Sequence, residues 1–178
     1  MDLTITTIGN KFDFVSFYSP LPTMTTPTAL KKFIFVDDVQ TLVAKVSAAT
    51  EGFKIARLLI LGHGCPGTQR VAIGNDFEGH EREYIRLNFL RMQTLNVSSE
   101  THLPFLRKLF AKNGRIEFHG CEVGAGQGGK IFLQRVSTIL GVPAFAGVDP
   151  QLLHPGYEGK LITANGQQIT EFEPSIFQ

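Results

Sequence analysis

The chain has 178 residues, 43% of them hydrophobic and 19% charged, with a formal net charge of +1. These values are those of an ordinary globular protein, and the length suits one domain that buries its own core. A near-neutral charge gives no reason to expect nucleic acid as a partner. No apolar stretch approaches the roughly 20 residues of a membrane-spanning helix, so no membrane partner is expected either.

The first residues, MDLTITTIGNKFDF, lack the basic segment and the apolar stretch of a signal peptide. We therefore expect a cytoplasmic protein, or one that is exported without a cleavable signal. Only two cysteines are present, which is too few for a disulfide framework. The sequence leaves the oligomeric state open.

In chain order, short apolar runs rich in β-formers alternate with segments of helical periodicity. Strands are predicted at 31–36, 55–62, 115–120 and 142–147, and helices at 37–49, 102–112 and 126–140. Alternating strands and helices indicate βαβ units, a mostly parallel sheet and helices on both of its faces. We therefore predict a three-layer α/β sandwich that forms a single domain over residues 1–178.

Glycines mark several predicted ends of these segments. The second helix should stop at Asn113–Gly114, and the third helix at Gly141. Asn165–Gly166 is typical of the turn of a β-hairpin. We predict such a hairpin at the C-terminus, over about 158–173.

The tripeptide His-Gly-Cys occurs twice, at 63–65 and at 119–121, and these two copies contain both cysteines. Each copy follows a predicted strand or ends one, and Asp37 and Asp149 also follow predicted strands. Parallel sheets bind ligands beyond the carboxyl ends of their strands. We therefore expect these reactive side chains at one edge of one sheet.

Zinc binding and phosphate binding are two functions that residues at such a sheet edge could have. Two His and two Cys are zinc ligands in type, but their H-x-C spacing is tighter than usual and the chain needs no metal to fold. The stretch GAGQGGKI (124–131) fits G-x-x-x-x-G-K, but Ile131 replaces the Ser or Thr that would ligate Mg²⁺. Its glycines would still let backbone amides at a helix N-terminus approach an anion. We expect neither a metal nor another cofactor.

Nucleophilic catalysis is the third such function. Cys121 lies between a predicted strand end and a glycine-rich helix start, where the helix dipole and free N–H groups favour a thiolate. His63, at the end of another strand, is placed to shuttle the proton. Gly64 lets backbone N–H groups approach a developing oxyanion.

Three blocks of the chain resemble, in the same order, segments of the caspase-like cysteine peptidases. They are FIFVDDVQTLVAKV, LILGHGCPGTQRVAIG and FHGCEVGAGQGGKIFLQRVSTILGVPAFAG. Within that group they are most similar to a bacterial domain family related to the CHAT peptidases, most of whose members are uncharacterised. The resemblance covers roughly residues 31–150, which would be the core of a caspase-like fold.

The resemblance implies roles for individual residues. His63 is similar to the catalytic base of these peptidases and Cys121 to their nucleophile, with the amides of Gly64 and Cys121 forming the oxyanion hole. Asp37 stands where related peptidases place a residue of the primary specificity pocket, and Asp149 is a second acidic candidate. An acid there would favour a basic residue before the scissile bond.

The chain departs from the family pattern in two ways. Cys65 stands where a small residue is expected, and it would either form a reversible disulfide with Cys121 or be inert. The segment before the His63 strand is short, so a peripheral strand of the fuller family would be missing. His119 is expected to be a packing residue behind the site.

The predicted function is that of a cysteine endopeptidase, which cleaves a protein or peptide substrate through a thioester intermediate. The alternative is a non-catalytic module of the same fold, for binding or as a toxin accessory, whose His-Cys pair is idle or locked by oxidation.

Overall fold

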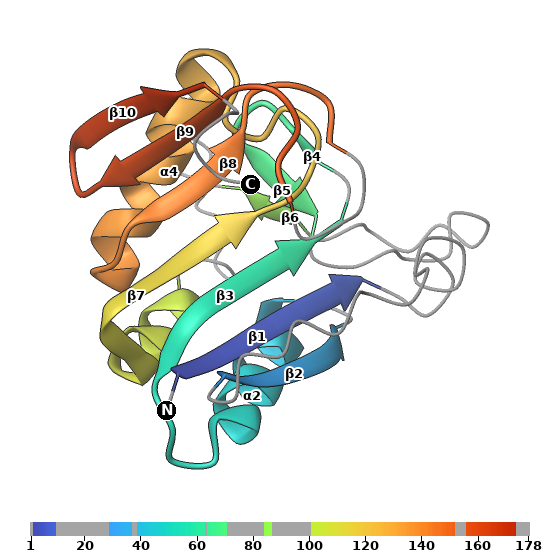
Figure 1. Ribbon diagram of the computed structural model, residues 1–178, viewed down its shortest axis with the longest axis vertical. Coiled ribbons are helices and arrows are strands. Elements are labelled where there is room, and N and C mark those ends of the chain that lie inside the picture. Colours follow the sequence, from blue (N-terminus) through green and yellow to red (C-terminus); the bar gives the residue numbers. More distant parts are fainter. Residues whose placement is uncertain are drawn as a thin grey trace.

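The computed structural model describes residues 2–9, 29–36, 39–62, 64–70, 84–86, 101–151 and 156–173. Asp37 and His63 lie outside the described residues. The described chain forms a seven-stranded sheet and a small three-stranded sheet, with helices behind the large sheet (Figure 1). No helix within these ranges is long and apolar enough to cross a membrane.

The large sheet has the strand order β10-β9-β8-β7-β3-β1-β2. Its strands are β1 (Asp2–Gly9), β2 (Ala29–Val36), β3 (Ile55–Leu61), β7 (Phe110–Phe118), β8 (Ala144–Gly147), β9 (Leu161–Asn165) and β10 (Gln168–Phe172). Strands β2, β1, β3, β7 and β8 pair in parallel, whereas β9 pairs antiparallel with both β8 and β10. The prediction of a mostly parallel sheet is therefore confirmed.

Strand β1 was not predicted from the sequence. It lies between β2 and β3 and pairs in parallel with both. Leu3 and Ile5 are fully buried in the core, and the neighbouring Thr6 and Thr7 are buried as well. The run of β-branched residues in LTITTI was the available signal, because such residues favour strands.

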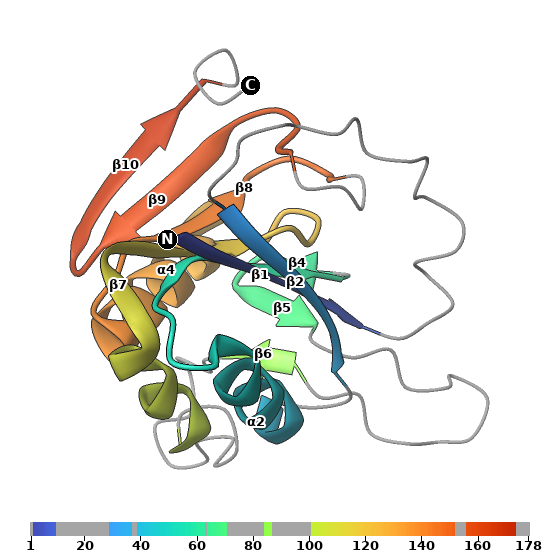
Figure 2. The same ribbon diagram turned by 60° about the horizontal axis from the view of Figure 1, so that its bottom comes forward.

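Three helices pack side by side on one face of the sheet (Figure 2): α2 (Val39–Thr50), the 3-10 helix η1 (Leu103–Leu109) and α4 (Gly126–Leu140). α2 lies between β2 and β3 in the chain, η1 between β3 and β7, and α4 between β7 and β8. All three connections cross the sheet in the same direction. Right-handed crossovers in one direction place their helices on one face. The predicted helices on the other face are absent from the described ranges.

The second predicted helix, 102–112, was wrong in its last three residues. The chain is helical up to Leu109, with Thr101 and His102 α-helical and Leu103–Leu109 a 3-10 helix, and it becomes extended at Phe110, where β7 begins. Asn113 and Gly114 therefore lie inside a strand, in an irregular stretch where the pairing with β3 shifts register. Leu103 and Leu106 are buried, and their spacing of three residues suits a 3-10 helix as well as the start of an α-helix.

The third predicted helix is confirmed. α4 spans Gly126–Leu140 and ends at Gly141, whose φ of 69° is left-handed and whose N–H donates to the Ser137 carbonyl. This is the glycine termination that the sequence indicated. The small sheet lies beside the start of α4 and consists of β4 (Gly64–Cys65), β5 (Thr68–Arg70) and β6 (Tyr84–Arg86), all antiparallel.

Candidate active site at the ends of β3 and β7

The two His-Gly-Cys tripeptides meet at the carboxyl edge of the large sheet. β3 and β7 are parallel neighbours there, and the His119 N–H donates to the Ile60 carbonyl at 2.9 Å. A Cβ atom on Gly64 would lie 3.0 Å from Gly120 Cα and 3.1 Å from the Cys121 carbonyl oxygen. The backbones of the two tripeptides are therefore in direct contact, and glycine at 64 and 120 permits the close approach.

The Cys121 side chain is partly buried and contacts the backbone of one residue. Its Sγ donates to the Gln151 carbonyl oxygen at 3.3 Å and accepts from the Gln151 N–H at 3.4 Å. A neutral thiol can make both contacts and a thiolate would keep the second, so the site offers a partner to either form. Both Cys65, which is exposed, and Cys121 are free thiols, so the disulfide considered between them is not formed.

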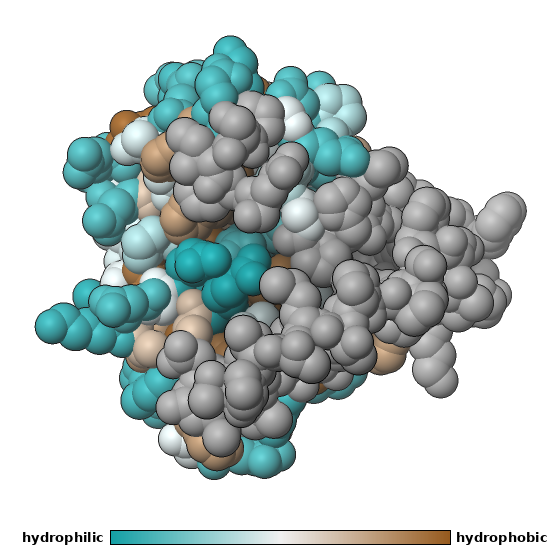
Figure 3. Space-filling view, viewed as in Figure 1, coloured by the Kyte–Doolittle hydropathy of each residue, from teal (hydrophilic) through white to brown (hydrophobic). Residues whose placement is uncertain are grey.

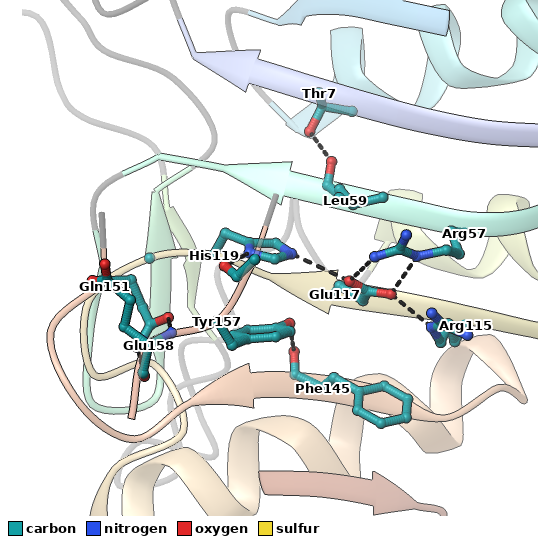
Figure 4. Close-up of polar contacts among 12 residues, drawn as sticks. Thr7, Arg57, Leu59, Arg115, Glu117, His119, Phe145, Gln151, Tyr157 and Glu158 are labelled. Carbon is teal, nitrogen blue, oxygen red and sulfur yellow. Dashed lines mark hydrogen bonds and ion pairs between the residues drawn. The ribbon is translucent and has the colours of Figure 1, made fainter. Parts of the chain in front are cut away.

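Gln151 holds the segment that carries these contacts. It is buried, and its Nε2 donates to the carbonyl oxygens of Asp149 at 2.8 Å and Glu158 at 2.6 Å. Its Oε1 accepts from the Glu158 N–H at 2.9 Å (Figure 4). The side chain thus joins the two ends of the connection between β8 and β9 and fixes its own backbone beside Cys121. Sequence reasoning missed this residue, because a lone glutamine outside any motif carries no local signal.

Replacing Gln151 by alanine should lower the free energy of unfolding by about 2–3 kcal/mol, because two part-buried backbone groups of Glu158 each lose a hydrogen bond. Urea denaturation measures this change. Gln134→Ala is the matched control, since Gln134 donates to a carbonyl oxygen in an exposed setting and should cost little. An equal loss in both variants would contradict the role given to Gln151.

Asp149 lies close to Cys121 in space. Its carbonyl oxygen accepts from the N–H of Glu122, the next residue after Cys121, at 3.1 Å. Its carboxylate Oδ2 accepts from the Lys160 N–H at 2.7 Å, and Oδ1 has no partner among the residues described. Asp37, by contrast, follows β2, which β1 and β3 separate from β7. At the usual spacing this puts the two strands about 14 Å apart.

The glycine-rich stretch 124–131 is explained by close packing. A Cβ atom on Gly129 would overlap the backbone of Gly124, and one on Gly67 would lie 2.7 Å from the Gly128 carbonyl oxygen. The Gly67 N–H also donates to the Val123 carbonyl at 3.0 Å. These glycines let the β4–β5 turn lie against the first turn of α4. They therefore need no bound phosphate to account for them.

A buried carboxylate lies on β7 before the candidate site, on the sheet face opposite the helices. Glu117 is only 3% exposed, and Arg57 binds both of its oxygens, from Nε and Nη2, at 2.7 Å each (Figure 4). Arg115 Nε adds a third bond at 2.6 Å. Burial alone would raise the pKa of Glu117, but hydrogen bonds from His119 and Arg57 lower it well below the usual range. The bond with Glu117 in turn raises the pKa of Arg57.

His119 connects this carboxylate to the loop after Gln151. It is fully buried, with Nε2 at 3.3 Å from Glu117 Oε2 and Nδ1 at 3.2 Å from the Gly156 carbonyl oxygen. Its ring stacks on that of Tyr157, with centroids 4.3 Å apart. Burial, aided by the charge of Glu117, raises the pKa of Tyr157 well above its usual value. Because both ring nitrogens face fixed acceptors, His119 packs and orients the loop, as the sequence led us to expect.

Comparisons with known proteins give no relative for this chain. No protein-family model matches it, and neither does any curated protein or solved structure. No group of three His, Cys, Asp or Glu side chains that could hold a metal ion is found in the part of the chain described.

Proposed function

We propose that this chain is a caspase-like cysteine endopeptidase, with Cys121 as the nucleophile and His63 as the general base. The observation that carries the proposal is the backbone contact of Gly64 with Gly120 and Cys121. One trans peptide link spans about 3.8 Å between Cα atoms, so the residue before Gly64 begins within reach of this contact. We propose that the imidazole of His63 reaches the Cys121 thiol from there.

The strand order supports the location of this site. The parallel strands follow the order β2-β1-β3-β7-β8, in which the direction of winding reverses between β1 and β3. Open α/β sheets with this order bind their ligands at the carboxyl edge, near the reversal. Gly64 and Cys121 follow β3 and β7 at that edge.

In the proposed mechanism, His63 takes the proton of the Cys121 thiol and the thiolate attacks the scissile carbonyl carbon. The negatively charged oxygen of the tetrahedral intermediate accepts hydrogen bonds from the backbone N–H groups of Gly64 and Cys121. The Cys121 amide makes no hydrogen bond within the described ranges, which leaves it able to donate. His63 then protonates the leaving amine, and water hydrolyses the thioester to release the acid and the free thiol.

Substrate preference is assigned to acidic groups beside the nucleophile. Asp149 is the better placed candidate, because its backbone is bonded to Glu122 and its Oδ1 is unpaired in the described structure. We propose that this carboxylate favours a Lys or Arg residue before the scissile bond. Asp37 remains a second candidate. It follows β2, which is three strands away from β7 in the sheet.

The test is alkylation with iodoacetamide near neutral pH, followed by peptide mass spectrometry. Cys65 is an exposed free thiol and serves as a reference within the same molecule. Cys121 should react at least about tenfold faster than Cys65, and His63→Ala should remove the difference, since the thiolate is the reactive species. His102→Ala, a histidine away from this edge, should change nothing.

A Cys121 that reacts no faster than Cys65 would overturn the proposal. It would favour the alternative, a non-catalytic module of the same fold. Unchanged reactivity in His63→Ala would remove His63 from its role as base.

A further inference from the structure

A second candidate site lies away from Cys121, near the amino ends of the central strands. It is a hollow of about 510 Å³ lined by Thr4, Ala56, Arg57, Ala111, Lys112, Asn113 and Arg115. Side chains alternate along a strand, and Leu58 and Ile116 point into the helix-covered core. Arg57 and Arg115 therefore lie on the opposite face. Figure 3, which looks onto that face, shows hydrophilic surface gathered over the middle of the sheet.

The hollow carries an excess of positive charge. Arg57, Lys112 and Arg115 line it, whereas none of the described lining residues is an Asp or Glu. The buried Glu117 behind them offsets one of the three positive charges, so two remain. Glu117 occupies Nε and Nη2 of Arg57 and Nε of Arg115. Arg57 Nη1 and both Nη atoms of Arg115 make no hydrogen bond with a described residue, and the Arg115 guanidinium also lies over the Phe145 ring, 5.8 Å from its centroid.

The type of these hydrogen-bond donors indicates which kind of ligand the hollow would bind. Guanidinium groups bind phosphate through paired N–H donors, and a lysine adds a point charge. A phosphate monoester carries nearly two negative charges at neutral pH, which matches the excess. The volume is within the range of small-molecule sites, roughly 300–1,000 Å³, and leaves room for an organic group beside the phosphate.

We infer that this hollow binds the phosphoryl group of a small phosphorylated compound. Glu117 holds the two guanidinium groups in place, so the donors are positioned before the ligand arrives. The hollow is separate from the proposed active site. Arg115 lies on β7, six residues before Cys121, and six residues of extended chain span up to about 20 Å. The inference stands whether or not Cys121 is catalytic.

The test is isothermal titration of the full chain with phenyl phosphate and with inorganic phosphate, in a low-salt buffer without other polyvalent anions. Lys112→Glu should weaken the binding of both at least tenfold. Lys112 is exposed, so this variant should fold normally. Lys108→Glu makes the same change of charge at an exposed position outside the hollow and should have a much smaller effect. Acetate, a monoanion, should bind far more weakly than either probe.

Tighter binding of phenyl phosphate than of inorganic phosphate would identify an organic ester as the ligand. Equal binding would identify the free ion, and both results support the site. Binding that Lys112→Glu and Arg115→Gln leave unchanged would overturn the inference. So would the failure of the wild-type protein to bind either probe at millimolar concentration.

Discussion

Replacing Cys121 by alanine should abolish peptide-bond hydrolysis by this chain, with a fall in rate on the order of 10⁴-fold or more, because the proposed thioester cannot form. The fold should persist, since the lost side chain makes two weak hydrogen bonds within the part of the chain described, both with the Gln151 backbone. The measurement is cleavage of a peptide library containing Lys and Arg, read by mass spectrometry, alongside thermal unfolding. Cys121→Ala with the cleavage rate of the wild type would show that another group carries out the reaction.

The matched control is Cys65→Ala. Cys65 is the other cysteine, it is exposed, and it lies two residues after the proposed base. It should be dispensable for cleavage, so its loss should leave the rate unchanged. A large loss of activity in Cys65→Ala would instead assign the nucleophile to the first tripeptide.

Replacing Glu117 by glutamine should lower the free energy of unfolding by about 3 kcal/mol, the lower end of the range for breaking a buried ion pair. The cost is large because His119 is fully buried and loses its charged partner. It is not larger because the side chains of Arg57 and Arg115 are 35% and 39% exposed and can turn towards water. Urea denaturation measures it. Glu171→Gln, which breaks the exposed pair with Lys130, is the control and should change stability little.

The contribution of Glu117 should also depend on pH in a defined direction. Its folded-state pKa lies well below the usual value, so the carboxylate stabilises the fold fully above the unfolded-state pKa of about 4.3. That contribution is lost progressively as the pH falls below this value towards the folded-state pKa. The stability gap between the wild type and Glu117→Gln should therefore narrow below about pH 4. A gap of constant size down to pH 2 would contradict the ion pairing.

Local sequence signals predicted the elements whose contacts are short in range. α4 was predicted from its periodicity and from Gly141, because a left-handed residue ends a helix wherever the helix lies. The strands before the two tripeptides were predicted from their apolar composition. The helix predicted over 102–112 failed at Phe110, because pairing with β3 extended the chain there and overrode its periodicity.

Only part of the candidate site could likewise be predicted from the sequence. His63, Gly64 and Cys121 could be proposed from motif and strand-end position alone. Gln151 could not, because its side chain bonds residues at both ends of the single connection between β8 and β9, and only the folded chain brings those ends together. The network around Glu117 was missed for a similar reason. Arg57 and Arg115 become neighbours only through the register of β3 and β7.

The sequence by itself determined which residues can react and which strand each one follows. Only the tertiary structure decided which strands are neighbours: β1 lies between β2 and β3, which separates β2, the strand before Asp37, from β7, while β3 and β7 pair directly. The physical reason is that strand pairing depends on backbone hydrogen bonds between distant segments, which leave no local pattern. The contact of Gly64 with Gly120, on which the proposed function rests, is a consequence of that pairing.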